Sequence, residues 1–90
     1  MWYVYILRCA DNSLYTGITT SISRRLNEHN SCNKKAAKYT RVRRPVNLAY
    51  AEQQLNRQEA SRREYQLKKY SKEKKELLVS SFVPSSDMEK

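Results

Sequence analysis

Glu64 is a carboxylate on the side of a predicted helix where apolar residues are expected. The helix begins after Asn56, a residue type that caps helix N-termini, and Glu59 follows three residues later as in a capping box. On a period of 3.6 residues, Ala60, Glu64 and Leu67 lie on one side of this helix. Because an unpaired buried carboxylate is unfavourable, Glu64 needs a cation, a hydrogen-bond network or access to a cleft. An arginine partner would make it structural, whereas a divalent cation would make it functional.

Two tyrosines and an arginine extend this set towards phosphodiester chemistry. Glu64 can hold a single divalent cation, Mg²⁺ or Mn²⁺, because such ions take oxygen ligands and Mg²⁺ keeps several waters. Arg25 can neutralise a phosphate with its planar guanidinium group. Tyr5 or Tyr15 can accept a proton from water if nearby cations lower the tyrosine pKa from about 10. Each also has an ordinary structural role, since strand tyrosines pack in cores and helix arginines are often solvated.

The composition of the chain argues against several other kinds of active site. The chain has nine acidic residues, one histidine (His29) and one glycine, which excludes a glycine-rich phosphate loop. Asp11 falls in a predicted turn and Asp87 near the C-terminus, so neither a two-metal site nor a Ser-His-Asp triad is readily assembled. Cys9 and Cys32 have no CxxC partner and are expected to be reduced thiols of a cytoplasmic protein.

The charge of the chain predicts a polyanionic partner. Lys and Arg number 18 against 9 acidic residues, a formal net charge of +9. Nucleic acid, DNA first, is the expected partner, and no stretch is apolar and long enough to suggest a membrane span. Six cationic residues of the segment 31–44, which is predicted to be a loop with at most one helical turn, are the candidate nucleic-acid-binding residues: Lys34, Lys35, Lys38, Arg41, Arg43 and Arg44.

The hydrophobic pattern predicts a small α/β protein. Residues 2–9 are apolar on both faces and are expected to form the central strand, paired as a hairpin with a strand at 14–19. Gly17, inside the second strand, indicates a bulge or a close approach of another group. The other predicted elements are helices at 21–30, 56–70 and 71–78 and a strand at 46–54, with Leu48 and Tyr50 on one face.

The order β-β-α-β-α-α favours a single-domain sandwich in which helices flank a three-stranded antiparallel or mixed sheet. One domain is expected over residues 1–79, followed by a flexible C-terminal tail over residues 80–90.

The spacing of these residues resembles that of the GIY-YIG nuclease family, and most closely its small standalone bacterial members. The first motif falls at Tyr3-Val4-Tyr5 and the second at Tyr15-Thr16-Gly17. Arg25 follows the glycine by eight residues, as the arginine of the family does, and His29 follows on the same helix. The segment from Glu59 to Glu64 is similar to the metal-binding helix of the family.

The resemblance implies a divalent-metal-dependent endonuclease acting on DNA, in repair or in processing of branched or damaged substrates. By position, Tyr5 and Tyr15 would line the catalytic site, with Tyr5 favoured as general base. Arg25 would bind the scissile phosphate, His29 would assist, and Glu64 would hold the metal. Tyr3 stands where the first motif has glycine and Thr16 where the second has isoleucine, and neither change removes a functional side chain.

Two further classes of function stay open at this stage. The first is a nucleic-acid-binding module, for DNA or RNA, with little or no catalysis, because few carboxylates surround Glu64 and a single metal ligand binds weakly unless substrate phosphate completes the shell. The second is an interaction module that docks on an acidic protein. A protein partner could also supply substrate specificity.

Overall fold

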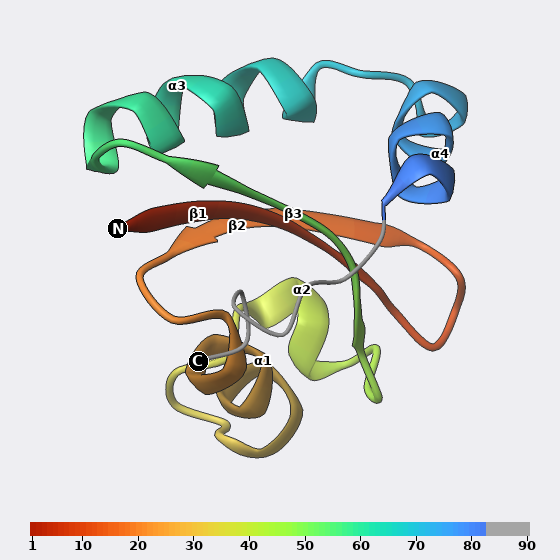
Figure 1. Ribbon diagram of the computed structural model, residues 1–90. Coiled ribbons are helices and arrows are strands. Elements are labelled where there is room, and N and C mark those ends of the chain that lie inside the picture. Colours follow the sequence, from red (N-terminus) through yellow and green to blue (C-terminus); the bar gives the residue numbers. More distant parts are fainter. Residues whose placement is uncertain (83–90) are drawn as a thin grey trace.

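A three-stranded antiparallel sheet with helices on both faces forms the protein (Figure 1). The computed structural model describes residues 1–82. Its elements in chain order are β1 (Trp2–Arg8), β2 (Leu14–Thr19), α1 (Ile22–Ser31), α2 (Lys38–Arg41), β3 (Asn47–Gln54), α3 (Arg57–Lys68) and α4 (Lys72–Ser81). The predicted order is confirmed, with the one-turn helix α2 added inside the basic segment. No helix in this part of the chain has the length and apolar character that crossing a membrane requires.

The central position of β1 follows from its composition. The strand order is β2-β1-β3, and both pairings of β1 are antiparallel. Val4, Tyr5, Ile6 and Leu7 are all almost fully buried, as a strand covered on both faces requires.

Alternation along β1 divides the core into two layers, one on each face of the sheet. Tyr5 and Leu7 point to the face covered by α1 and α2, where Ile22 and Val46 complete the cluster. On the other face, side chains of β1 pack with Ala60 and Leu67 of α3, while α4 adds partly buried residues. The sheet therefore carries one buried layer on each face.

The strand β3 differs from its prediction because of a β-bulge. Tyr50 pairs with Ile6, but Leu48 pairs with Leu7, so Ala49 is an extra residue in β3. The extra residue reverses the alternation. Leu48 consequently packs in the layer beneath α1 and Tyr50 in the layer beneath α3, and the prediction that they share a face was wrong.

Polar side chains cap α1, α3 and α4, and the cap at Asn56 was predicted. Ser21 accepts a hydrogen bond from the backbone N–H of Arg24, and Ser71 does the same for Lys74. Asn56 caps α3 through the N–H of Glu59. These caps determine where α1, α3 and α4 begin.

The end of α4 differs from the predicted domain boundary. The helix continues to Ser81, two residues beyond the boundary at residue 79, with backbone of Phe82 as its C-cap. Within the predicted tail of residues 80–90, residues 83–90 lie outside the described part of the chain.

A network around Glu52 fastens α3 to the sheet. The Glu52 carboxylate accepts hydrogen bonds from Arg63 Nε at 2.9 Å, Tyr50 Oη at 3.0 Å and Gln54 Nε2 at 2.9 Å. The carboxylate of Glu52 is the largest cause that raises the pKa of Arg63. Because Arg63 directly precedes Glu64, this network also determines where Glu64 lies.

Replacing Glu52 with Gln is expected to lower the free energy of unfolding by about 1–2 kcal/mol, because hydrogen bonds to charged groups contribute more than neutral ones. Urea unfolding at neutral pH measures the change. Glu59→Gln is the matched control, since the Glu59–Arg62 pair is far more exposed, and it should cost about 0.5 kcal/mol or less. Equal losses in the two variants would contradict a fastening role for Glu52.

Candidate active site

The ring of Tyr5 lies directly across Gly17. The two residues are paired between β1 and β2, and a Cβ at position 17 would lie 2.5 Å from Tyr5 Oη and 2.7 Å from its Cζ. Gly17 does not have a positive φ, so the close approach and not the backbone conformation requires glycine here. Since β2 is an edge strand, Tyr5 thereby carries its hydroxyl group from the central strand to the edge of the sheet.

The hydroxyl group of Tyr5 meets His29 of α1. Tyr5 Oη lies 2.9 Å from His29 Nε2, and the other ring nitrogen, Nδ1, lies 2.7 Å from Thr40 Oγ1 of α2. The side chains of His29 and Thr40 are fully buried. Three segments distant in sequence are thus joined by one line of hydrogen bonds.

Both titratable groups of this line are neutral at pH 7. Burial, with Arg25 adding to it, lowers the pKa of His29 to about 4. Burial likewise raises the pKa of Tyr5 to about 12, opposed by Arg25 and supported by the nearby Tyr15 and Glu64. Tyr5 therefore keeps its proton in the free protein, and a pKa low enough for direct base action, as the sequence hypothesis required, is not present.

Tyr15 forms one wall around His29. Its ring is edge-on to the imidazole with centroids 5.4 Å apart, and it stacks on Tyr39 at 5.9 Å. The guanidinium of Arg43 lies 3.9 Å from the centroid of Tyr39. This stack closes the site on the side of α2.

Arg25 is bound to an acidic side chain of its own helix. Its Nη1 donates to Glu28 Oε1 at 3.0 Å and to the backbone carbonyl of Lys35 at 2.7 Å. Arg24 and Lys35 also lie within 4 Å of the same carboxylate, and the hydrogen bond from Arg25 is the main cause that lowers the Glu28 pKa. Glu28, which sequence reasoning missed, is an anion among three cations beside the site.

Glu64 approaches from the opposite face of the sheet. It belongs to α3, which packs against β1 and β2, and its charge contributes to the raised pKa of Tyr5. The Glu64 carboxylate is therefore near enough to the Tyr5 hydroxyl group for its charge to act on it. On α3, Ala60 and Leu67 flank Glu64 and are fully buried, whereas the Glu64 side chain is 24% exposed.

The surroundings of Glu64 fit a single divalent cation. The Glu64 carboxylate pairs with Lys68 Nζ at 3.4 Å. The Lys68 side chain is largely exposed, so a cation can displace it from Glu64. Within residues 1–82, no three His, Cys, Asp or Glu residues gather closely enough to hold a metal. A cation here would have Glu64 as its protein ligand and water or substrate oxygens as the others.

The six predicted nucleic-acid-binding residues divide into two groups. Arg43 donates hydrogen bonds to Asp11 and to the carbonyl of Tyr39. Arg44 donates to the carbonyl of His29 and to Asn33. Both side chains are half-buried and hold the segment to the rest of the protein. The other four side chains are exposed: Lys34, Lys35, Lys38 and Arg41.

The two residues that depart from the family motifs make none of the hydrogen bonds of the Tyr5–His29–Thr40 line. Tyr3 is partly buried in the layer beneath α1. Thr16 is 3% exposed, and its hydroxyl group has no hydrogen-bond partner within the described residues, which accounts for an apolar residue in the motif at this position.

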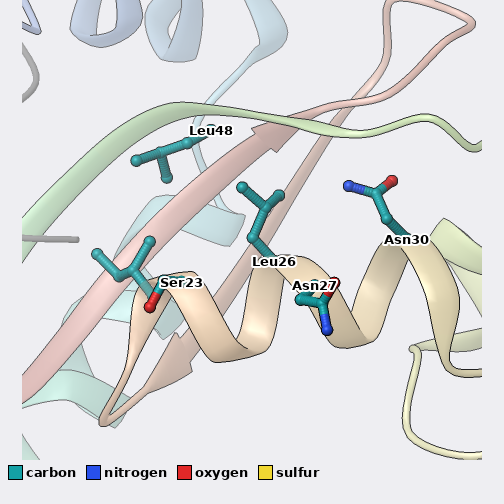
Figure 2. Close-up of a pocket in the computed structure, with 6 residues that line it drawn as sticks. Ser23, Leu26, Asn27, Asn30 and Leu48 are labelled. Atoms are coloured by element: carbon teal, nitrogen blue, oxygen red, sulfur yellow. The ribbon is translucent and has the colours of Figure 1, made fainter. Parts of the chain in front are cut away.

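A hollow of about 400 Å³ lies between α1 and β3 (Figure 2). Leu26 and Leu48 form apolar parts of its wall, and Ser23, Asn27 and Asn30 lie along α1. None of the predicted catalytic residues lines it.

Comparison with known proteins identifies the class to which this fold and site belong. Residues 1–76 match the family model described as the GIY-YIG catalytic domain. The chain belongs to the GIY-YIG nuclease family, and the expected family resemblance is confirmed.

Within this family the chain is similar to small bacterial proteins named UPF0213. A UPF0213 protein of Desulfotalea psychrophila is 56% identical over 80 residues, covering 89% of this chain and 72% of the relative. A UPF0213 protein of Staphylococcus haemolyticus is 52% identical over 73 residues, and the match covers 81% of this chain and 87% of that relative. The solution NMR structure of a UPF0213 protein from Bacillus halodurans is 48% identical, with a TM-score of 0.55, and the match covers 89% of this chain and 84% of that one.

The depressed pKa of His29 predicts a loss of stability in mild acid. The unfolded chain binds a proton at His29 below about pH 6.5, whereas the folded protein does so only near pH 4, so stability falls as the pH drops through this window. The contribution of His29 to this loss at pH 4 is about 3 kcal/mol.

Urea unfolding between pH 7 and pH 4, with His29→Gln alongside, measures this contribution. Gln has no titration in the window, so the pH slope of the variant should be shallower by this amount. Parallel slopes for the two proteins would contradict the assignment.

Gly17→Ala is expected to destabilise the protein by about 1–3 kcal/mol, because the added methyl group displaces the Tyr5 ring. In a Tyr5→Leu background the same change should cost almost nothing, since Leu has no atoms where Cζ and Oη were. Chemical unfolding of the four proteins gives this coupling energy. An equal cost of Gly17→Ala in both backgrounds would mean that backbone, not the Tyr5 ring, requires the glycine.

Proposed function

We propose that this protein is a divalent-metal-dependent endonuclease that hydrolyses phosphodiester bonds in DNA. The observation that carries the proposal is the contact of Tyr5 Oη with His29 Nε2 beside Arg25, in a chain of the GIY-YIG family. These are the groups that a water-activating, phosphate-binding site requires.

Tyr5 and His29 act together in the proton transfer. Tyr5 Oη accepts the proton of the attacking water as it passes its own proton to His29 Nε2, so that no free phenolate forms. This relay suits a tyrosine that is protonated and a histidine that is neutral at pH 7. A phosphate bound beside His29 raises the pKa of this residue, because it adds negative charge and neutralises Arg25.

Arg25 binds the scissile phosphate. Its guanidinium group carries a strong charge-assisted donor at Nη1, now occupied by Glu28 and by the carbonyl of Lys35. The bound phosphate accepts the Arg25 hydrogen bonds in place of Glu28 and the Lys35 carbonyl. Before the phosphate binds, Glu28 pairs with Arg24, Arg25 and Lys35.

Glu64 holds one Mg²⁺ or Mn²⁺ ion. When bound, the ion supplies Lewis-acid stabilisation of the charge that develops on the phosphate and the leaving oxygen. Glu64 would be the protein ligand of this ion, and water or substrate oxygens would be the others.

The exposed cations Lys34, Lys35, Lys38 and Arg41 bind the DNA backbone. Phosphate contacts make binding salt-dependent and carry no sequence information. We therefore expect cleavage directed by substrate structure, in DNA repair or in processing of branched DNA, in the cytoplasm and with specificity added by a protein partner.

Glu64→Gln is expected to lower cleavage by at least about 10²-fold while DNA binding persists, because the metal loses its protein ligand and the basic surface is unchanged. The assay presents supercoiled plasmid, nicked duplex, single-stranded DNA and a branched junction, with Mg²⁺ or Mn²⁺. Glu59→Gln is the matched control on the same helix and should retain activity.

The outcomes of this assay separate the two leading functions. Full cleavage by Glu64→Gln would remove the metal role of Glu64. Absence of product from the wild-type protein on every substrate, with salt-sensitive binding retained, would favour the nucleic-acid-binding module.

A further inference from the structure

Thr40 has a buried hydroxyl group that contacts His29 at Nδ1, the ring nitrogen that does not face Tyr5. It lies in α2 with no exposed surface, and its Oγ1 is 2.7 Å from His29 Nδ1 and 3.0 Å from the backbone carbonyl of Ala37. The segment that holds it was predicted only to bind phosphates, and a single threonine there gives no sequence signal of its own.

The donors and acceptors around Thr40 allow one arrangement in which every proton has a partner. A carbonyl oxygen can only accept, so the single hydroxyl proton of Thr40 is donated to Ala37. Thr40 Oγ1 then accepts from His29, and Nδ1 of the ring carries the proton. Because a neutral imidazole has one N–H, Nε2 has a free lone pair, and it faces the Tyr5 hydroxyl at 2.9 Å.

The reverse arrangement leaves two defects. If Thr40 donated to His29, its Oγ1 and the Ala37 oxygen would lie 3.0 Å apart with no proton between them. His29 Nε2–H would then donate to Tyr5, and no described residue would accept the Tyr5 proton, since His29 is the hydrogen-bond partner of Tyr5 in this part of the chain. Buried polar groups without partners are unfavourable by about 1–3 kcal/mol each.

We propose that Thr40 is a positioning residue that holds His29 in the Nδ1–H tautomer and so makes Nε2 the acceptor for the Tyr5 proton. Its catalytic consequence rests on the proposed function. The assignment adds a second role to the basic segment, because the helix that presents Lys38 and Arg41 to a substrate also sets the protonation of the site.

The backbone around Thr40 holds the hydroxyl group in place. The N–H of Arg41 donates to the Ala37 carbonyl at 3.0 Å, and the N–H of Arg43 donates to the Thr40 carbonyl at 3.0 Å. Arg43 also stacks on Tyr39 of the same turn. The one-turn helix is therefore held on both sides of Thr40.

The ¹⁵N spectrum of the His29 ring tests the tautomer directly. His29 is the only histidine in the chain, so ring-labelled, tag-free protein at pH 7 gives a single imidazole that needs no assignment. We expect a pyrrole-type Nδ1 and a pyridine-type Nε2. A pyrrole-type Nε2 in the wild-type protein would overturn the proposal without any variant.

Thr40→Val and Thr40→Ser test the residue itself. Val fills the same volume without an acceptor, so the ring should shift towards the Nε2–H form and cleavage should fall by about 10²-fold. Ser keeps the hydroxyl group and should keep both the tautomer and most of the activity. A Val variant with the wild-type spectrum and the wild-type cleavage rate would overturn the proposal.

The two readouts separate failure of this proposal from failure of the proposed function. If the wild-type protein cleaves no substrate, the nuclease assignment fails, while the ring spectra of the wild-type, Val and Ser proteins still decide what Thr40 does.

Discussion

The hydrogen bond between Tyr5 and His29 is the contact on which the arrangement of the site depends. It links the central strand to α1 inside the apolar layer, where a buried polar group without a hydrogen-bond partner is unfavourable. Its geometry in turn requires glycine at position 17 and a second partner for the other ring nitrogen of His29. A buried polar line is favourable only when all its members are satisfied, which explains why three separate segments converge there.

Salt bridges between distant segments supplement the thin core of this domain. The hairpin turn is held to the segment before β3 by Asp11 and Arg43, and the end of β1 to α4 by Arg8 and Glu76. These arginines are therefore engaged within the protein, although each pair also uses an acidic residue and so leaves the net charge of +9 unchanged. Exposed cations lie on both faces of the sheet: Lys34, Lys35, Lys38 and Arg41 after α1 and in α2, and Arg57, Arg62, Lys68, Lys69, Lys72 and Lys74 along α3 and α4. The first group adjoins Thr40, so one of these basic surfaces lies beside the line of hydrogen bonds.

Charge placement around the site suits an enzyme completed by its substrate. Arg25 has an internal anion in Glu28, and Glu64 has an exposed lysine as its partner. Both contacts keep a charge paired in the free protein, and both can be exchanged for a phosphate or a metal ion. Because one carboxylate holds a divalent ion weakly, substrate phosphate contributes to the metal site in the proposed enzyme.

The sequence by itself determined the strands, the caps and the helix face of Glu64, because these follow from local patterns of apolar residues and from side chains within three or four positions. The GIY-YIG motifs likewise predicted Tyr5, Tyr15, Arg25, His29 and Glu64 as site residues, and the family match confirms the family resemblance.

Tertiary structure alone decided how these residues meet. Tyr5 and His29 are 24 positions apart and His29 and Thr40 are 11 apart, so no local pattern links them. The extra residue in β3 places Leu48 and Tyr50 on opposite faces, and only the pairing of β3 with β1 reveals it. Arg43 and Arg44 became fasteners because carbonyl and carboxylate oxygens of other segments lie within their reach. Such outcomes depend on the packing of segments distant in sequence, which a pattern along the chain does not contain.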